Sequence, residues 1–220
     1  MLVEVWSDVV CPWCYIGKRR FEEAQRRLAD DPTFDDELEV VYRPYQLDPT
    51  APPGTTMPVA EAYARKFGGP ERAAQLMDHV TRTAAADGLT FRLERAKRAN
   101  TRDAHRLLWW ALTSGPPGAQ GALKERLMQA YFVDGGDVGD PDLLAGVAVE
   151  SGLDEGSARS FLASDEGTAE LAESLAFAAE AGITAVPTYV IDGAWSIPGA
   201  QDPDVFVQVL ARLAARRRAG

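Results

Sequence analysis

Residues 2–20 of this 220-residue chain have the sequence LVEVWSDVVCPWCYIGKRR, and this stretch decides the fold. Its first six residues alternate between two faces of an extended chain and predict a β-strand. After the Cys-Pro-Trp-Cys motif at residues 11–14, apolar or small residues recur every three or four positions. This spacing predicts a helix that follows the strand directly. The expected buried face of that helix comprises Cys14, Gly17, Phe21, Ala24 and Leu28.

The rest of the chain first extends this unit and then interrupts it. A second strand is expected at 38–42, and a strand–helix–strand unit favours parallel pairing with a right-handed crossover. Five prolines between residues 44 and 58 indicate a linker. Beyond it the pattern predicts helices, one of them over 165–181. Another has an expected buried face of Ala104, Leu107, Leu108, Ala111 and Leu112.

Strand character returns near the C-terminus. Residues 185–191 are β-rich, Asp192-Gly193 is a strong two-residue hairpin turn, and 194–197 form the expected return strand. A closing helix begins at Pro203. The order β-α-β, helices, then α-β-β-α predicts an α/β fold with a helical insertion. The expected sheet domain comprises residues 1–58 and 182–220, and the insertion comprises 59–181, with its last helix leading back to the sheet.

The two cysteines require a chemical explanation, because a disulfide across two intervening residues restricts the unfolded chain little. The positive end of a helix and its unpaired N–H groups favour a thiolate at Cys11, which is the expected exposed nucleophile. Cys14 begins the buried face and is the expected resolving thiol, which attacks a mixed disulfide. This is the redox interpretation of the pair.

Two other interpretations of the pair remain open. The weaker of the two is a metal site, which needs ligands beyond the two cysteines. His79 and His105 are too far apart in sequence for a zinc-finger-like spacing, so no bound metal is expected. The cysteines could also be inert core residues. Both histidines are expected at helix surfaces or core edges. The aromatic pairs Trp109-Trp110 and Tyr131-Phe132 are expected in the core, with an apolar groove wall as the alternative.

Pro187 lies inside an otherwise strand-like run, where proline indicates an edge strand or a bulge. A cis Val186–Pro187 peptide bond is the rarer alternative. A proline turn opposite Cys11 could present the backbone of Val186 to an extended substrate for strand-like pairing.

Composition limits the partners. The chain has 23 Lys and Arg against 33 Asp and Glu, a formal charge of −10, which argues against binding nucleic acid or anionic membranes. No apolar run reaches the length of a transmembrane span, and the N-terminus lacks the basic and apolar regions of a signal peptide. A cytoplasmic protein is therefore expected.

Three stretches resemble a known family: residues 8–20 (DVVCPWCYIGKRR), 100–107 (NTRDAHRL) and 182–201, which ends in Pro-Gly-Ala-Gln. Together they resemble the DsbA-like branch of the thioredoxin superfamily, and more narrowly the FrnE-type oxidoreductases. The resemblance implies a thioredoxin fold split by a helical domain, thiol–disulfide exchange at the dithiol, and a cis-proline at Pro187. The leading hypothesis is therefore a thiol–disulfide oxidoreductase that binds no metal or organic cofactor and acts on a disulfide-containing protein or a small thiol or disulfide.

Relatives in the same branch suggest an alternative function. They include 2-hydroxychromene-2-carboxylate isomerases and kappa-class glutathione transferases, which carry serine in place of Cys11 and bind glutathione near the cis-proline. The alternative is therefore a glutathione-dependent isomerase or transferase for a small aromatic compound, with glutathione as co-substrate. A third class is a non-catalytic redox sensor or chaperone, and a homodimer is compatible with the aromatic-rich helices. The candidate substrate-binding residues are Trp13, Val186, Gly199, Ala200 and Gln201.

Overall fold

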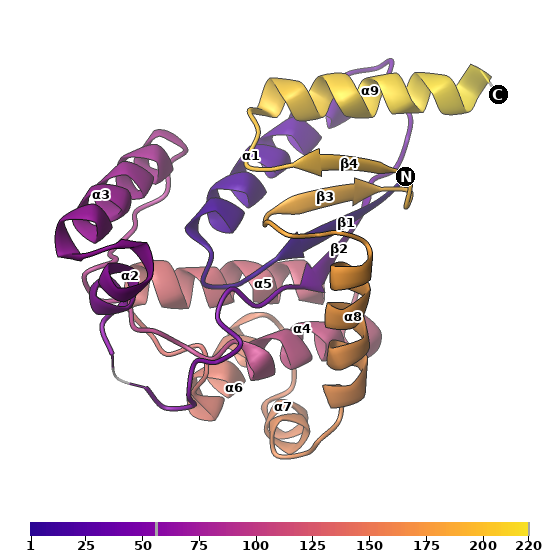
Figure 1. Cartoon of the computed structure of the whole chain (residues 1–220). Coiled ribbons are helices and arrows are strands. Elements are labelled where there is room, and N and C mark those ends of the chain that lie inside the picture. The colour runs from indigo at the N-terminus through magenta and orange to yellow at the C-terminus, as the bar shows by residue number, and fades with distance from the viewer. Residues whose placement is uncertain (56, 220) are drawn as a thin grey trace.

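The computed structural model describes residues 1–55 and 57–219, so Thr56 of the expected linker and the terminal Gly220 lie outside the described residues. The strands form one sheet of order β2-β1-β3-β4 (Figure 1). β1 (Leu2–Ser7) pairs parallel with β2 (Glu39–Pro44) and antiparallel with β3 (Thr188–Ile191). β3 pairs antiparallel with β4 (Trp195–Pro198). Segments from both ends of the chain thus complete one sheet, which confirms the predicted α/β fold class.

The first helix, α1 (Pro12–Ala29), follows β1 after a short loop. All five residues of its predicted inner face are buried. They include Phe21 and Leu28, which pack with Val3 and Val5 of β1. The closing helix α9 (Pro203–Ala219) adds Phe206 and other apolar residues to this core. Helices α1 and α9 therefore lie on the same side of the sheet (Figure 1).

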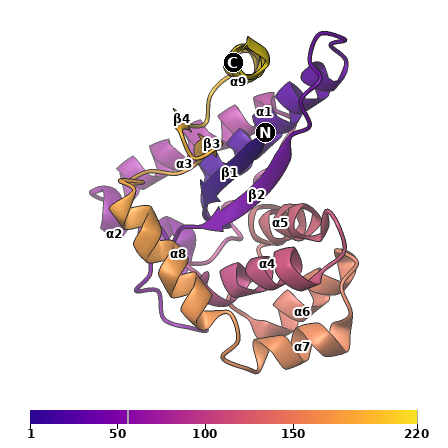
Figure 2. The same cartoon turned by 90° about the vertical axis from the view of Figure 1, so that its right-hand side faces the viewer.

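Between β2 and β3 the chain is helical: α2 (Val59–Phe67), α3 (Pro70–Ala86), α4 (Arg102–Ser114), α5 (Ala119–Gln129), the π-helical turn η1 (Ala130–Asp134), α6 (Pro141–Glu150), α7 (Glu155–Leu162) and α8 (Thr168–Glu180). Figures 1 and 2 show α4 to α7 gathered beyond the β2 edge of the sheet, with α2 and α3 beside the start of α1. These helices share a core with Cys11 and Cys14. The insertion and the dithiol therefore belong to one packed unit. The exact division at residues 58 and 182 stays a prediction.

Helix α8 covers the opposite side of the sheet from α1. Trp6 of β1 packs with Ala178 and Ile183, and its ring stacks on Phe177 at 5.8 Å between centroids. Along the described residues, no helix has the length and apolar character needed to cross a bilayer.

Some expected boundaries differ from the structure. The helix expected over 165–181 begins at Thr168, because Gly167, with φ of 75°, precedes its first turn. The strand expected from residue 185 begins at Thr188, whose hydroxyl donates to the carbonyl of Ala185 at 2.7 Å and holds residues 185–188 in a bend. Leu112 was expected in the core but is 39% exposed, because the last turn of α4 faces solvent.

Candidate active site

Cys11 is the N-cap residue of α1. Its backbone is extended, with φ of −85° and ψ of 114°, and its Sγ accepts a hydrogen bond from the Cys14 N–H at 3.3 Å. Pro12 occupies the first turn, where the absence of an N–H costs no hydrogen bond. Both cysteines are free thiols. An amide donor and the helix dipole therefore act on the Cys11 sulfur, and both stabilise a thiolate.

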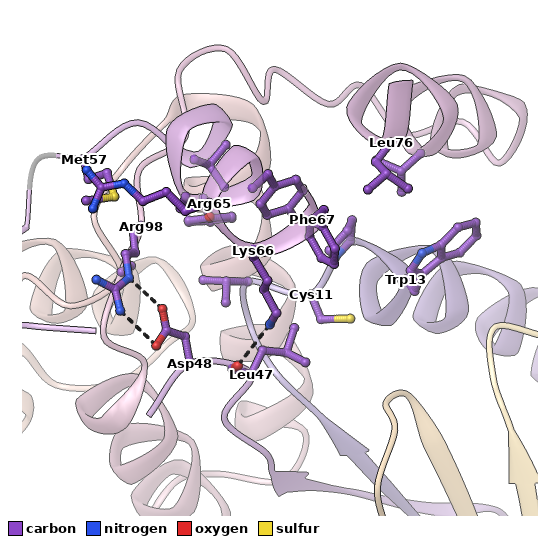
Figure 3. A pocket seen from close by; sticks show the side chains of 18 of the residues that line it. Cys11, Trp13, Leu47, Asp48, Met57, Arg65, Lys66, Phe67, Leu76 and Arg98 are labelled. Atoms are coloured by element: carbon purple, nitrogen blue, oxygen red, sulfur yellow. Dashed lines mark hydrogen bonds and ion pairs between the residues drawn. The ribbon is translucent and has the colours of Figure 1, made fainter. Parts of the chain in front are cut away.

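The expectation that Cys11 is exposed is wrong. Cys11 is only 3% exposed, because the carbonyl of Val186 lies 3.8 Å from its Sγ and the neighbouring segments cover the rest. Cys11 nevertheless lines a pocket of about 820 Å³, so a substrate can approach it from there. Figure 3 shows its sulfur turned toward the space that Trp13 and Phe67 border.

Cys14 is buried behind Cys11, as expected for a resolving thiol. Burial raises the pKa of Cys14 well above its usual range, and the hydrogen bond and charge of Cys11 raise this pKa further. Lys124 and the backbone N–H of Asp8 act in the opposite direction. Cys14 is therefore a protonated thiol at neutral pH in the resting protein.

The loop that contains Pro187 lies close to α1. The Val186–Pro187 peptide bond is cis, and so is the Gly199–Ala200 bond. A Cβ atom on Gly17 would lie 2.9 Å from Cγ of Pro187, so α1 can approach the proline only because this residue is glycine. The N–H of Gly199 donates to the carbonyl of Pro187 at 2.8 Å. This packing holds the Val186 backbone against Cys11.

Only some of the expected substrate-binding residues line this pocket. Trp13 and Val186 line it, whereas Gly199, Ala200 and Gln201 do not. Gly199 donates to Pro187, the carbonyl of Ala200 accepts from Arg20 at 3.2 Å, and the side chain of Gln201 donates to the carbonyl of Pro198 at 2.6 Å. The remaining walls come mainly from the loop after β2, from α2 and from α3, with Leu47, Met57, Val59, Tyr63, Phe67, Leu76, Val80 and Tyr131 as apolar lining residues.

Polar side chains lie around this apolar lining. Arg98 forms a two-pronged ion pair with Asp48, at 2.6 and 3.1 Å, and Lys66 donates to the carbonyl of Leu47 at 3.4 Å (Figure 3). His79 packs on Trp13, with ring centroids 5.9 Å apart. The pocket suits a ligand that is mostly apolar and carries a few polar groups.

A buried polar cluster lies behind the dithiol, and sequence reasoning missed it. Asp8 is fully buried; one carboxylate oxygen lies 3.1 Å from Nε2 of His105, and the other accepts the N–H of Leu47 at 2.8 Å. His105 was expected at a helix surface or core edge and is instead buried, because Asp8 satisfies its ring nitrogen. Lys124 is also buried. Its spacing from Gln120 and Leu127 on α5 is the signal that could have placed it inward.

The two aromatic pairs differ in how deeply they are buried. Tyr131 and Phe132 are buried, and Tyr131 also lines the pocket, whereas Trp109 and Trp110 are half-buried and stack on Phe161. Among the residues described, no group of three or more His, Cys, Asp or Glu side chains gathers as metal ligands would.

Comparison with known proteins places this site in a family. The model of the DSBA-like thioredoxin domain matches residues 2–211. The chain is 30% identical to the uncharacterized protein YwbO of Bacillus subtilis over 225 residues, which cover 95% of both chains. It is 38% identical to a probable DsbA oxidoreductase from Streptomyces coelicolor, whose crystal structure matches with a TM-score of 0.85 over 96% of this chain and 89% of that one. DsbM, a cytosolic disulfide reductase from Pseudomonas aeruginosa, shares the fold at 21% identity, with a TM-score of 0.65 over the whole of both chains. The chain belongs to the family of DSBA-like thioredoxin domains.

Proposed function

We propose that this protein is a cytoplasmic thiol–disulfide oxidoreductase of the FrnE type that uses its Cys-Pro-Trp-Cys dithiol to reduce disulfides. The observation that carries the proposal is the position of Cys11, whose sulfur caps α1 and lines the pocket. A helix N-terminus stabilises the thiolate that such a nucleophile needs. The match to the DSBA-like family and the 38% identity to a probable DsbA oxidoreductase support the same chemistry.

The proposed cycle has two exchange steps. The Cys11 thiolate attacks one sulfur of a substrate disulfide, a mixed disulfide forms, and the other substrate sulfur leaves as a thiolate that takes up a proton. Cys14 then loses its proton and attacks Sγ of Cys11. The Cys11–Cys14 disulfide forms, and the second substrate sulfur leaves as a thiolate. The substrate gains two electrons from the dithiol, and a low-molecular-weight thiol such as glutathione reduces the protein again.

The proline loop supplies the substrate position in this proposal. An extended substrate pairs with the backbone of Val186 as with a strand edge, which brings its disulfide to Cys11. The 3.8 Å distance between the Val186 carbonyl and Cys11 Sγ supports this role, and the packing of Gly17 on Pro187 holds the loop in place. Trp13 borders the same pocket and contacts the substrate there. Gly199 holds Pro187 through its N–H, and Ala200 and Gln201 continue the same segment toward α9.

The proposed direction of electron transfer, from the dithiol to the substrate, follows from the absence of a positive charge within the Cys-Pro-Trp-Cys motif. Pro12 supplies no N–H, and Trp13 offers a neutral indole where a protonated imidazole would add a full charge. The dithiol is therefore less oxidising than that of DsbA, and the glutathione pool of the cytoplasm keeps it mostly reduced. DsbM, which has the same fold, is a cytosolic disulfide reductase.

Insulin reduction with glutathione as the reductant tests the proposal. The wild-type protein is expected to turn over, Cys11→Ser to lose turnover completely, and Cys14→Ser to accumulate a mixed disulfide at Cys11 that mass spectrometry detects. Full activity in Cys11→Ser would contradict the proposal. Rapid acid quenching and alkylation in cells checks the direction, since a mainly oxidised pair would reverse it.

One observation favours the alternative, a glutathione-dependent isomerase or transferase. The pocket in front of Cys11 has an apolar lining and, at about 820 Å³, is large enough for a small aromatic compound. In that case the thiolate of bound glutathione acts as the nucleophile. Calorimetry with reduced glutathione on the Cys11→Ser, Cys14→Ser double variant separates the two functions, because only the alternative requires binding without the dithiol.

A further inference from the structure

Lys124 is a buried cation that the proposed cycle leaves unused. It is 1% exposed, and across the described part of the chain its Nζ finds no hydrogen-bond partner. The ring of Tyr42, 5.7 Å away, is the aromatic group that faces it. Burying a charge without a partner is costly, so such a group needs an explanation. Lys18 shows the usual solution, since it is also buried but pairs with Glu22 at 2.5 Å and Glu125 at 2.6 Å.

The packing of α5 fixes the position of this amine. Gln120, one turn earlier, exchanges two hydrogen bonds of 2.9 Å with the backbone of Tyr42, which attaches α5 to β2. Leu123 and Leu127 are fully buried on the same side of α5. Lys124 therefore extends into the core that encloses the dithiol.

Charged and titratable groups approach Lys124 from several elements. Cys14 and Lys18 lie on α1, and Cys11 and Asp8 precede it. Tyr42 faces it from β2, while His105 of α4 is held by Asp8. All of these except Lys18 and His105 become negative when they lose a proton, and burial raises the pKa of Tyr42 above its usual range, so its phenol stays neutral. The dithiol and Asp8 are thus the negative charges that this cation can stabilise.

We propose that the buried ammonium of Lys124 stabilises the thiolate of Cys14 in the step in which Cys14 displaces the substrate from Cys11. The inference rests on the proposed function and adds to it a positioning residue from the helical insertion. Lys124 acts on the reaction through Cys14 and does not contact the substrate.

The timing of the two steps supports this role. In the resting protein the hydrogen bond and the charge of Cys11 raise the pKa of Cys14, and Lys124 lowers it. When Cys11 forms the mixed disulfide, its negative charge is gone, whereas Lys124 stays in place. The effect of the ammonium on Cys14 is therefore opposed least when Cys14 must become a nucleophile.

Before Cys14 attacks Cys11, one proton must leave the pair formed by Cys14 and Lys124. Burial lowers the pKa of Lys124 to about 8, and Cys14, Asp8 and Cys11 act against this. The pair of Cys14 and Lys124 holds two protons at low pH and loses one as pH rises. The reactive state has a thiolate and an ammonium. Its thiolate forms the bond to Cys11 Sγ, the substrate sulfur leaves with the electron pair and takes a proton from water, and Lys124 keeps its proton.

Stopped-flow reaction of the reduced protein with one equivalent of dithiobis-nitrobenzoate (Ellman's disulfide) tests the role. Attack by Cys11 releases the first coloured thiolate, and attack by Cys14 releases the second. In Lys124→Met the first phase is expected to keep its rate within about twofold. The second phase at neutral pH is expected to slow by about tenfold or more, which corresponds to an upward displacement of its pH midpoint by one unit. Lys18→Met, which removes another buried ammonium, is the matched control and leaves that midpoint in place.

The outcomes separate this inference from the proposed function. An unchanged midpoint in Lys124→Met, or an equal slowing of both phases, would overturn the role of Lys124 while leaving the dithiol chemistry intact. A wild-type protein that releases no first thiolate would overturn the proposed function itself. If Lys124→Met does not fold, as circular dichroism shows, Lys124→Gln and the wild-type profile decide. In Lys124→Gln the midpoint of the second phase must lie about one unit above that of the wild-type protein, and an equal midpoint in the two proteins contradicts the inference.

Discussion

Gly17 is the residue that lets the dithiol helix meet the proline loop. A Cβ atom there would lie 2.8 Å from the hydroxyl of Tyr189, 2.9 Å from Cγ of Pro187 and 3.3 Å from Cβ of Ala200. Two of these distances are shorter than real Cβ contacts, so any side chain would push α1 and the loop apart. Because Cys11 and Val186 sit on these two segments, the separation would also open the site.

Gly17→Ala is therefore expected to destabilise the protein by about 1–3 kcal/mol, the usual cost of overpacking. It should also slow the attack of Cys11 on Ellman's disulfide. Gly121→Ala is the matched control, because Gly121 lies in α5 with open space around its Cβ direction, and alanine in a helix gains up to about 1 kcal/mol over glycine. Denaturant unfolding checks both. A Gly17→Ala protein as stable and as reactive as the wild type would show that this contact does not hold the loop.

Residues could be predicted from the sequence where a local pattern carries the chemistry. Cys11 and Cys14 form a short motif at a strand-to-helix junction, so their proximity follows from helix geometry. Asp8, His105 and Lys124 come from a loop and two helices far apart in the chain. Only tertiary packing brings them behind the dithiol, and no local spacing encodes that packing.

Helices α1 and α5 are joined by a charged network around Glu125. Its carboxylate accepts from Lys18 at 2.6 Å, from Arg19 at 2.9 Å and from the hydroxyl of Tyr15 at 2.7 Å. Burial alone would raise the pKa of Glu125, but these three partners outweigh it and lower the pKa below its usual range. The network attaches the helical insertion to the helix that carries both cysteines.

A pH dependence of stability follows from this network. A carboxylate with a lowered pKa stabilises the fold above its unfolded pKa, and the contribution is lost as pH falls through its folded pKa. Glu125→Gln is therefore expected to be less stable by about 1–3 kcal/mol at neutral pH. The difference from wild type should shrink in acid.

Urea unfolding at several pH values checks this dependence, with Glu61→Gln as the control. Glu61 forms an exposed i,i+4 pair with Arg65, whose loss costs about 0.5 kcal/mol or less. A difference between Glu125→Gln and wild type that stays constant from neutral to acidic pH would contradict the proposed role of the carboxylate.

Elements were predictable where capping and turn residues mark them. Asp140 and Asp154 accept backbone N–H groups at the starts of α6 and α7, and the Asp192-Gly193 turn joins β3 to β4. The start of α8 differs from the expected residue 165 because Gly167 supplies the positive φ that precedes the helix. The backbone conformation of residue 167 sets the start of α8, and residue type alone does not reveal that conformation.

At the scale of the whole molecule, the pocket in front of Cys11 lies between the sheet domain and the helical insertion. The start of α1 and the proline loop form one wall, and the loop after β2 together with α2 and α3 forms the other. Three large apolar side chains at this pocket remain exposed: Trp13 at 36%, Leu47 at 37% and Phe67 at 42%. In the proposed cycle, this exposed apolar surface is expected to favour disulfides that carry an apolar group next to the sulfur.

Phe67→Ala is expected to raise KM for an apolar aromatic disulfide several-fold, with little change in kcat, because the ring contributes binding in the ground and transition states alike. Phe177→Ala is the control, since this phenylalanine is 58% exposed but lies on α8, outside the pocket. Steady-state kinetics with an aromatic and a small polar disulfide checks the expectation. Equal changes in both variants would show that the apolar walls do not select the substrate.

The most direct test of the central claim is the reduction potential of the Cys11–Cys14 pair, measured by equilibrating the protein with glutathione buffers. We predict a reversible two-electron transition at roughly −250 to −150 mV, between thioredoxin and DsbA, because the helix N-terminus stabilises the reduced form without an added cationic residue in the motif. A pair that forms no reversible disulfide, or one with a potential below about −300 mV as in structural disulfides, would contradict a redox-active dithiol.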